Sequence, residues 1–292
     1  MRRREVLLPV AAKTRPSTKE TAHREVSPAP EAPEALETTS NEAFLGTSGW
    51  AYPSWKPGFY PDKLPQKKFL EYYATQLNSV EVNYTFQHLP TASTLANWLA
   101  AANPRFRFSF KAPQRLTHIL RLKDGSETLS ALASALAPVV AAGQMGVVLF
   151  QLPPNFKADL PRLASFLADA APSGLPMAFE FRHSSWFCDE VYAALRNYGV
   201  ALCVAESDDL ETPDIVTAAF TCYRFRKSEY SAAQLDGIEN TLRQRLVTGR
   251  VFAYFKHEEQ PTGALYAADM LRRLQRYERP HLPAAGMELD GR

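Results

Sequence analysis

The sequence predicts a single (β/α)8 barrel, a TIM barrel, that follows a disordered N-terminal leader. Two observations lead to this fold class. Short runs rich in β-branched and aromatic residues alternate eight times with stretches whose apolar residues recur at helical spacing. Strands that alternate with helices pair in parallel, and eight such units within residues 44–277 match the usual size of a closed barrel.

The two ends of the chain are predicted to lie outside this barrel. Residues 1–43 are rich in Ala, Pro, Glu, Thr and Ser and contain no aromatic residue. A segment of this composition buries too little apolar surface to offset the loss of chain entropy. We therefore expect a disordered leader at 1–43, a TIM-barrel domain at 44–277 and a flexible tail at 278–292.

Strands and helices are expected in alternation along the barrel domain. The predicted strands are 44–48, 79–83, 106–111, 146–151, 177–182, 200–205, 220–226 and 251–256. Apolar residues at helical spacing predict helices at 70–77, 92–102, 129–136, 160–170, 188–198, 235–246 and 264–277. A further helix is expected at 209–216, although Pro213 interrupts it. An open doubly wound sheet is the alternative, but the turn at 46–50 lacks the glycine pattern of dinucleotide-binding proteins.

The composition is that of an ordinary globular protein. Hydrophobic residues make up 46% of the chain, charged residues 22%, and the formal net charge is +2. A nearly neutral molecule does not attract nucleic acid as a whole, so only a local basic patch would bind it. No apolar run approaches the roughly 20 residues that span a bilayer, and we expect a cytoplasmic protein without membrane contact. Cys188, Cys203 and Cys222 lie far apart, which argues against a disulfide framework or a zinc knuckle.

Polar side chains gather at the carboxyl ends of the predicted strands, where TIM barrels carry their sites. By the period of two, these positions are Glu81, Asn83, Ser109, Lys111, Gln151, Glu180, Arg182, Arg224, Arg226 and Lys256, with His183, Glu206 and His257 just beyond their strands. Each Glu opposite an Arg has a structural explanation, a buried ion pair. The excess of cations nevertheless predicts a pocket for an anion, because Arg and Lys bind phosphate and carboxylate.

Aromatic residues and possible metal ligands lie around the same predicted mouth. Trp50, Tyr84 and Trp186 would stack on a base or sugar ring, or they would simply fix long loops over the barrel. Carboxylates and imidazoles at the strand ends are potential zinc or manganese ligands, but no His-x-His or His-Glu-x-x-His pattern occurs and the neighbouring cations would repel a metal. We predict no metal site and no cofactor.

Five separated motifs follow one another in a recognisable order. They are Gly46-Thr47-Ser48-Gly49-Trp50, Val80-Glu81-Val82-Asn83, Lys111 with Thr117-His118, Phe150-Gln151-Leu152-Pro153-Pro154, and Glu180-Phe181-Arg182-His183. Over about residues 44–276 the chain resembles the YecE-like family, domain of unknown function seventy-two. The resemblance implies a (β/α)8 barrel and no established activity.

Two positions depart from the pattern common in that family. Arg224-Phe225-Arg226-Lys227 stands where many members read Arg-Leu-His-Gly. Phe255-Lys256-His257-Glu258 stands where many read Phe-Asn-Asn-Asp. Both changes add positive charge to the predicted mouth, which favours a more anionic ligand for this chain.

The sequence thus predicts an enzyme, a hydrolase or an isomerase or lyase, that uses acid–base chemistry on a phosphorylated or otherwise anionic substrate. The predicted catalytic residues are Glu81, Glu180 and His183. The predicted substrate-binding residues are Asn83, Lys111, Gln151, Arg182, Arg224, Lys256, Trp50, Tyr84 and Trp186. Two alternatives stay open, a non-catalytic nucleic-acid-binding protein and a metal-dependent phosphodiesterase. The sequence does not indicate the oligomeric state.

Overall fold

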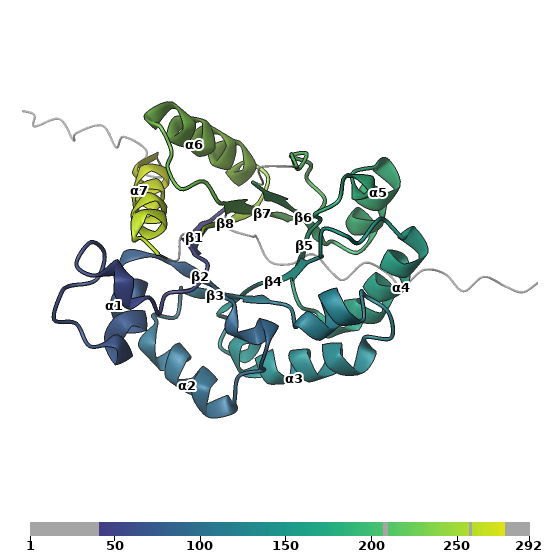
Figure 1. Cartoon of the computed structure of the whole chain (residues 1–292), viewed down its shortest axis with the longest axis horizontal. Coiled ribbons are helices and arrows are strands. Elements are labelled where there is room, and N and C mark those ends of the chain that lie inside the picture. Colours follow the sequence, from purple (N-terminus) through teal and green to yellow (C-terminus); the bar gives the residue numbers. More distant parts are fainter. Residues whose placement is uncertain (1–40, 207–209, 257–258, 278–292) are drawn as a thin grey trace, which may run out of the picture. The chain divides into compact units, whose positions relative to one another are not determined.

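A computed structural model describes residues 41–206, 210–256 and 259–277, which form a TIM barrel (Figure 1). Its eight parallel strands follow one another in the order β1-β8-β7-β6-β5-β4-β3-β2. They are β1 Ala43–Thr47, β2 Ser79–Val82, β3 Arg107–Lys111, β4 Met145–Gln151, β5 Met177–Glu180, β6 Ala201–Ala205, β7 Phe220–Phe225 and β8 Arg250–Phe255. The predicted fold class is confirmed, and every predicted strand is found within two residues of its expected bounds. Almost all of the predicted leader, the tail and His257 lie outside the described residues.

Seven α-helices surround the strands in the described part of the chain (Figure 1). They are α1 Phe69–Gln76, α2 Ala92–Ala101, α3 Ser126–Ala141, α4 Leu160–Ala170, α5 Asp189–Asn197, α6 Ala232–Leu246 and α7 Thr262–Tyr277. On α3 the predicted apolar stripe is buried at Leu132 and Leu136, because four-residue spacing keeps both on one side of the helix. None of the described helices is long and apolar enough to cross a membrane.

The helix predicted at 209–216 is wrong for the residues that can be compared. Residue 209 is outside the described part, and 210–219 contain no helix. The Thr217 hydroxyl donates to the Val200 carbonyl at 2.7 Å and accepts from the Leu202 amide at 2.8 Å. Since Pro213 has no N–H to donate, the segment instead lies along β6 and bonds to it through side chains.

Side chains complete the ring between β1 and β2, where the described backbone forms one isolated bridge. The Tyr73 hydroxyl accepts from the amide of Thr47 in β1 at 2.8 Å and donates to the carbonyl of Ser79 in β2 at 3.0 Å. Asn78 bonds to β1 through both its oxygen and its nitrogen, at 2.8 and 2.7 Å. Gly46 permits this close approach, because a Cβ there would lie 1.9 Å from the Ser79 carbonyl oxygen.

The inside of the barrel changes in character from one end to the other. The part nearer the amino ends of the strands, which we call the lower interior, contains an apolar cluster. Its members are Phe44, Val147, Leu149, Ala178, Ala201, Cys203, Phe220, Cys222, Phe252 and Tyr254. At the side of this cluster nearer the carboxyl ends, the Tyr254 hydroxyl lies 2.6 Å from Ser109 Oγ and 2.9 Å from Ser79 Oγ. On three strands the next inward position toward the carboxyl end carries a charge, at Glu81, Glu180 and Arg224, and these polar ends meet in one place.

Candidate functional site

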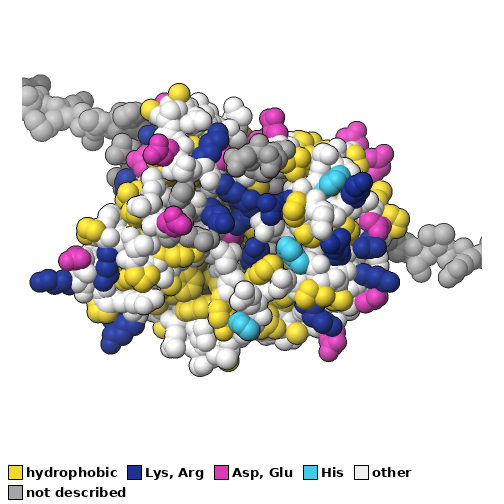
Figure 2. Space-filling view, in the orientation of Figure 1, with side chains coloured by type: hydrophobic (Ala, Val, Ile, Leu, Met, Phe, Trp, Pro, Cys, Tyr) yellow, Lys and Arg dark blue, Asp and Glu magenta, His cyan; other side chains and the backbone are white. Residues whose placement is uncertain are grey.

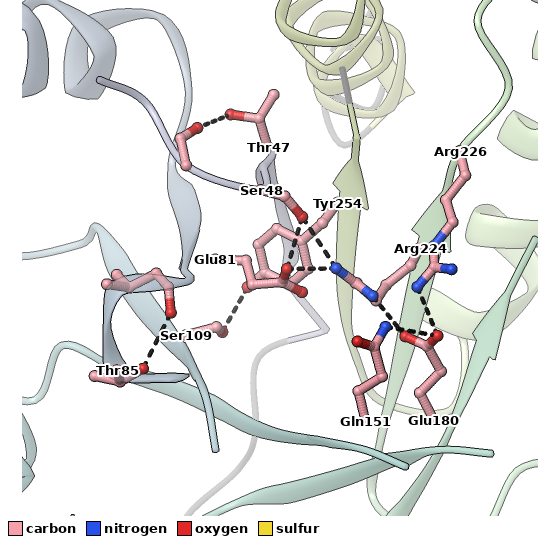
Figure 3. Close-up of polar contacts among 12 residues, drawn as sticks. Thr47, Ser48, Glu81, Thr85, Ser109, Gln151, Glu180, Arg224, Arg226 and Tyr254 are labelled. Atoms are coloured by element: carbon pink, nitrogen blue, oxygen red, sulfur yellow. Dashed lines mark hydrogen bonds and ion pairs between the residues drawn. The ribbon is translucent and has the colours of Figure 1, made fainter. Parts of the chain in front are cut away.

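A buried arginine joins two carboxylates at the top of the barrel interior (Figure 3). Arg224 Nη1 lies 2.5 Å from Glu180 Oε2, and Arg224 Nη2 lies 2.7 Å from Glu81 Oε1. The side chain of Arg224 is 3% exposed and each carboxylate 1%. Ser48 Oγ donates to Glu81 Oε1 at 2.6 Å and lies 3.2 Å from Arg224 Nη2. These bonds hold the guanidinium in one orientation, and they are the buried ion pairs that the sequence left open as an alternative.

Glu180 has further cationic and polar neighbours. Gln151 Nε2 donates to Glu180 Oε1 at 2.9 Å, and Arg226 Nη2 reaches the same oxygen at 2.6 Å (Figure 3). Burial alone would raise the pKa of Glu180, but the charges of Arg224 and Arg226 outweigh it and lower that pKa to about 2. Glu180 is therefore ionised at neutral pH and is a weak proton acceptor.

An open cavity of about 460 Å³ lies in front of these ion pairs; we call it the mouth cavity. Its walls are Asn83, Tyr84, Phe86, Gln87, His88, Lys111, Gln151, Arg182, Arg224, Arg226 and Lys256. Five of these side chains are cationic, and none of the lining residues that the structure describes is acidic. Figure 2 shows the corresponding group of Lys and Arg side chains at the centre of the face. The convergence predicted from the strand ends is thus present in the structure, and the charge of the walls is positive.

Two of these cations have no acidic partner among the described residues. Lys111 Nζ lies 4.2 Å from the ring centroid of Phe86, and no described carboxylate is within ion-pair distance of it. Burial, followed by the charge of Arg224, lowers the pKa of Lys111 to about 8. Arg182 makes no hydrogen bond or ion pair with any described residue, although it is half-buried. An anion in the cavity would meet both side chains without displacing an internal partner.

A smaller cavity of about 230 Å³ adjoins the mouth cavity. Glu180, Arg182, His183, Ser184 and Thr212 contribute to its walls, and Arg182 borders both cavities. The imidazole Nδ1 of His183 accepts from the backbone amide of Ser185 at 3.1 Å. In the neutral ring the proton therefore resides on Nε2.

The predicted aromatic residues occupy three different environments. Trp186 is completely buried, stacks on Phe181 at 4.7 Å and donates to the Phe156 carbonyl at 2.7 Å. It fixes a loop, as the alternative interpretation held, and lies in the core instead of at the mouth. Trp50 packs edge-on against Trp98 at 5.3 Å and does not line the mouth cavity. Tyr84, 52% exposed, does line it.

Three further residues lie at or beside the site, although they were not among the predicted catalytic and substrate-binding residues. Arg226, one residue beyond β7, was expected among the cations at the strand ends, and its Nη2 bonds to Glu180. Phe86 covers the Lys111 ammonium, and no local pattern predicts that contact. His118, half-buried beyond β3, lies edge-on to Phe86 at 5.2 Å, and the Thr117-His118 motif was its signal.

Potential metal ligands do not cluster in the described part of the chain. No three His, Cys, Asp or Glu side chains there lie close enough together to hold a metal ion. Glu81 and Glu180 are bonded to guanidinium groups, and His257, another potential ligand, is outside the described residues.

Comparison with known proteins identifies relatives along most of the chain. Residues 44–287 match the family described as "Protein of unknown function DUF72". The UPF0759 protein YecE of Escherichia coli K12 is 30% identical over 146 residues, 49% of this chain and 50% of that protein. The UPF0759 protein YunF of Bacillus subtilis is 28% identical over 154 residues, 51% of this chain and 54% of that protein. The chain thus spans about half the length of the curated relatives it matches.

Solved structures of the same family have the same fold. A DUF72 family protein from Thermotoga maritima superposes with a TM-score of 0.72 at 25% identity, over 80% of this chain and 99% of that one. A DUF72 family protein from Enterococcus faecalis gives a TM-score of 0.68 at 16% identity, over 80% and 95% of the two chains. The resemblance inferred from the five motifs is confirmed, and the chain belongs to the DUF72 family.

Proposed function

We propose that the mouth cavity binds a small molecule bearing phosphate or carboxylate and that the protein is an enzyme acting on it by acid–base chemistry. The observation that supports this most is the presence of two cations, Lys111 and Arg182, without a described acidic partner in a half-buried cavity. Removing a charge from water is costly unless an opposite charge replaces the lost hydration. An anionic ligand would supply that charge, and a volume of about 460 Å³ suits a metabolite.

The described contacts suggest different roles for the residues in and around the cavity. Glu81 and Glu180 would act as positioning residues that hold Arg224, because the low pKa of Glu180 makes it unsuited to proton transfer near neutral pH. Proton transfer would instead fall to Lys111, whose pKa lies near 8, and to the imidazole of His183.

Calorimetric titration with inorganic phosphate and pyrophosphate, at constant ionic strength, tests the binding. We expect one site, and Arg182→Gln should weaken it roughly tenfold or more, the effect of losing a charged hydrogen bond. Arg107→Gln is the matched control, because Arg107 lies at the opposite end of β3 from Lys111 and covers the Phe44 ring. Equal losses in the two variants would mean that binding is diffuse electrostatics and would contradict a built site.

A nucleic-acid-binding function is the second candidate, and the exposed ring of Tyr84 beside the cations is the observation that favours it. Aromatic rings next to basic side chains stack on unpaired bases. Fluorescence anisotropy with random single-stranded oligonucleotides distinguishes the two functions. Tight binding that falls steeply with salt and is weakened by Tyr84→Ala would support this candidate, whereas phosphate binding without oligonucleotide binding would exclude it.

A further inference from the structure

We propose that Lys111 is a nucleophile that forms an imine with the carbonyl carbon of an anionic aldehyde or ketone bound in the mouth cavity. The proposal rests on the anion-binding function above and deepens it. It adds the substrate class, small anionic carbonyl compounds, and a covalent step. It also favours an isomerase or lyase over a hydrolase, because imines activate bonds next to the former carbonyl carbon.

The first argument is the position of the amine. Lys111 and Lys256 are the two lysines that line the mouth cavity, and the other cations there are arginines, which stay protonated. Lys256 is exposed, whereas Lys111 is half-buried against Phe86. Lys111 is therefore the better-desolvated amine, and it extends into the cavity without a described carboxylate that would fix it as an ammonium.

The second argument is the fixed charge beside it. Arg224 cannot turn away from Lys111, because Glu81 and Glu180 hold both ends of its guanidinium. Burial and this neighbouring cation disfavour the ammonium form, and the pKa of Lys111 is lowered to about 8. About one amine in ten is then neutral at pH 7, compared with fewer than one in a thousand for an ordinary lysine.

The third argument concerns the segment that follows β3. A single π-helical turn, Arg115–Ile119, begins four residues after Lys111. Beyond it, Arg121, Leu122 and Asp124 have left-handed φ angles of 50°, 66° and 49°. Such turns and strained residues concentrate at functional sites, since folding alone does not favour them.

The same segment carries a second group for proton transfer. His118 packs edge-on against the Phe86 ring, whose face contacts Lys111 Nζ. Burial and the charge of Lys111 lower the pKa of His118, so its ring is neutral and able to accept a proton.

The covalent step needs no oxidant or reductant. The neutral Nζ of Lys111 attacks the carbonyl carbon, a C–N bond forms, and the carbonyl oxygen becomes a hydroxyl by taking up the proton that the nitrogen loses. His118 or solvent would carry this proton. The hydroxyl then takes up a proton from protonated His118 or solvent and leaves as water while the nitrogen lone pair forms the second C–N bond. The nitrogen finally returns its remaining proton to the same acceptor, so that amine and carbonyl give imine and one water. Arg182 would hold the anionic group of the substrate.

Borohydride trapping tests the proposal on the full chain. The protein is incubated separately with pyruvate, glyoxylate and dihydroxyacetone phosphate, reduced with sodium borohydride, and analysed by intact mass and peptide mapping. We expect one adduct per chain, located on Lys111 and suppressed by excess inorganic phosphate. Mapping on the unaltered protein makes this result independent of whether any variant folds.

Two variants separate this proposal from the anion-binding function. Lys111→Arg keeps the positive charge but not the nucleophile, so it should bind phosphate within about threefold of the original chain and form no adduct. Lys68→Arg, the matched control at an exposed lysine outside the mouth cavity, should still form it. The imine proposal is overturned if no adduct appears with the three compounds, or if Lys111 reacts no more than exposed lysines such as Lys68. Phosphate binding with no adduct leaves the anion site standing, whereas absent phosphate binding overturns both.

Discussion

The two ends of the barrel interior differ sharply although the same strands build them. On β7 the inward positions are Phe220 and Cys222 in the lower part and Arg224 toward the mouth, and Arg226 lies just beyond the strand. On β8 the inward series likewise runs from an apolar side chain, Phe252, toward a cation at the carboxyl end. On β7 a step of two residues, from Cys222 to Arg224, is therefore enough to pass from apolar packing to a buried charge that lines the mouth cavity.

Different forces maintain the two regions. In the lower interior, apolar side chains gain free energy from leaving water, and the stacked rings of Phe44 and Phe252, 5.0 Å apart, are an example. At the mouth, buried ion pairs contribute little net stability because both charges lose hydration. We infer that the charged layer is kept for binding, and the following predictions test this contrast, beginning with the largest effect.

Removing the central guanidinium should have the largest effect. Arg224→Gln leaves Glu81 and Glu180 buried without their main partner, and we expect a loss of about 3–5 kcal/mol in urea unfolding together with loss of phosphate binding. Phe252→Leu, in the lower interior, should cost less than about 1.5 kcal/mol and leave phosphate affinity unchanged. If the Arg224→Gln protein has the same free energy of unfolding as the original, the ion pairs do not stabilise the charged layer.

Acid should reduce the stability contributed by the ion pairs at the mouth before it affects the apolar packing of the lower interior. The pKa of Glu180 in the folded protein is about 2, below its ordinary 4.5, so its stabilising contribution is complete above pH 4.5. That contribution is lost as the pH falls from about 4.5 toward 2 and amounts to about 3 kcal/mol. Urea midpoints measured between pH 6 and 2.5 would show it, and Glu180→Gln should give a flatter profile. Parallel profiles for the two proteins would refute the assignment.

The boundary between the two regions can be located at Ser109. Its hydroxyl contacts the Tyr254 hydroxyl at 2.6 Å and accepts from the Val147 amide at 2.8 Å. Ser109→Ala leaves the Val147 amide without its partner and the Tyr254 hydroxyl with Ser79 alone, and it should cost about 1–2 kcal/mol of stability. Phosphate affinity, measured by calorimetry, should stay the same. A change in affinity would extend the binding region down into this layer.

The smallest expected effect is a pH dependence of anion binding. With a pKa of about 8, Lys111 is charged below that pH and neutral above it. The affinity for sulfate, whose own charge is constant, should therefore fall roughly three- to tenfold between pH 7 and 9. Lys111→Arg should abolish the decrease. A decrease of the same size in that variant would assign the titration to another group.

Local patterns predicted much of the fold, because alternation and helical spacing are properties of neighbouring residues. The strand positions and the inward direction of Glu81, Glu180 and Arg224 followed from the period of two. The helix expected at 209–216 failed because hydroxyl contacts with a distant strand, such as that of Thr217, stabilise an extended segment. The repeat of strand and helix favoured a helix there, although Pro213 argued against it.

Contacts across the barrel could not be predicted in the same way. Arg224 and Glu81 are 143 positions apart, and their meeting depends on the register of every strand pair between them. The burial of Trp186 depends likewise on how its loop packs against Phe181, which no local pattern specifies. Sequence reasoning therefore placed the carboxylates and cations at the strand ends but did not predict how they pair or that Trp186 would be buried.

The contact between β1 and β2 is the place where we expect the ring of strands to separate first. There the amide of Thr47 is held by the Tyr73 hydroxyl, and that of Leu45 by the Asn78 side chain, instead of by a neighbouring strand. Side chains change rotamer far faster than paired strands separate, so these two amides should exchange with deuterium sooner than those of β8. Ser48 follows β1 and Glu81 lies in β2, and both side chains bond to the guanidinium of Arg224. A small separation of β1 from β2 would therefore move Arg224 and a ligand bound in the mouth cavity.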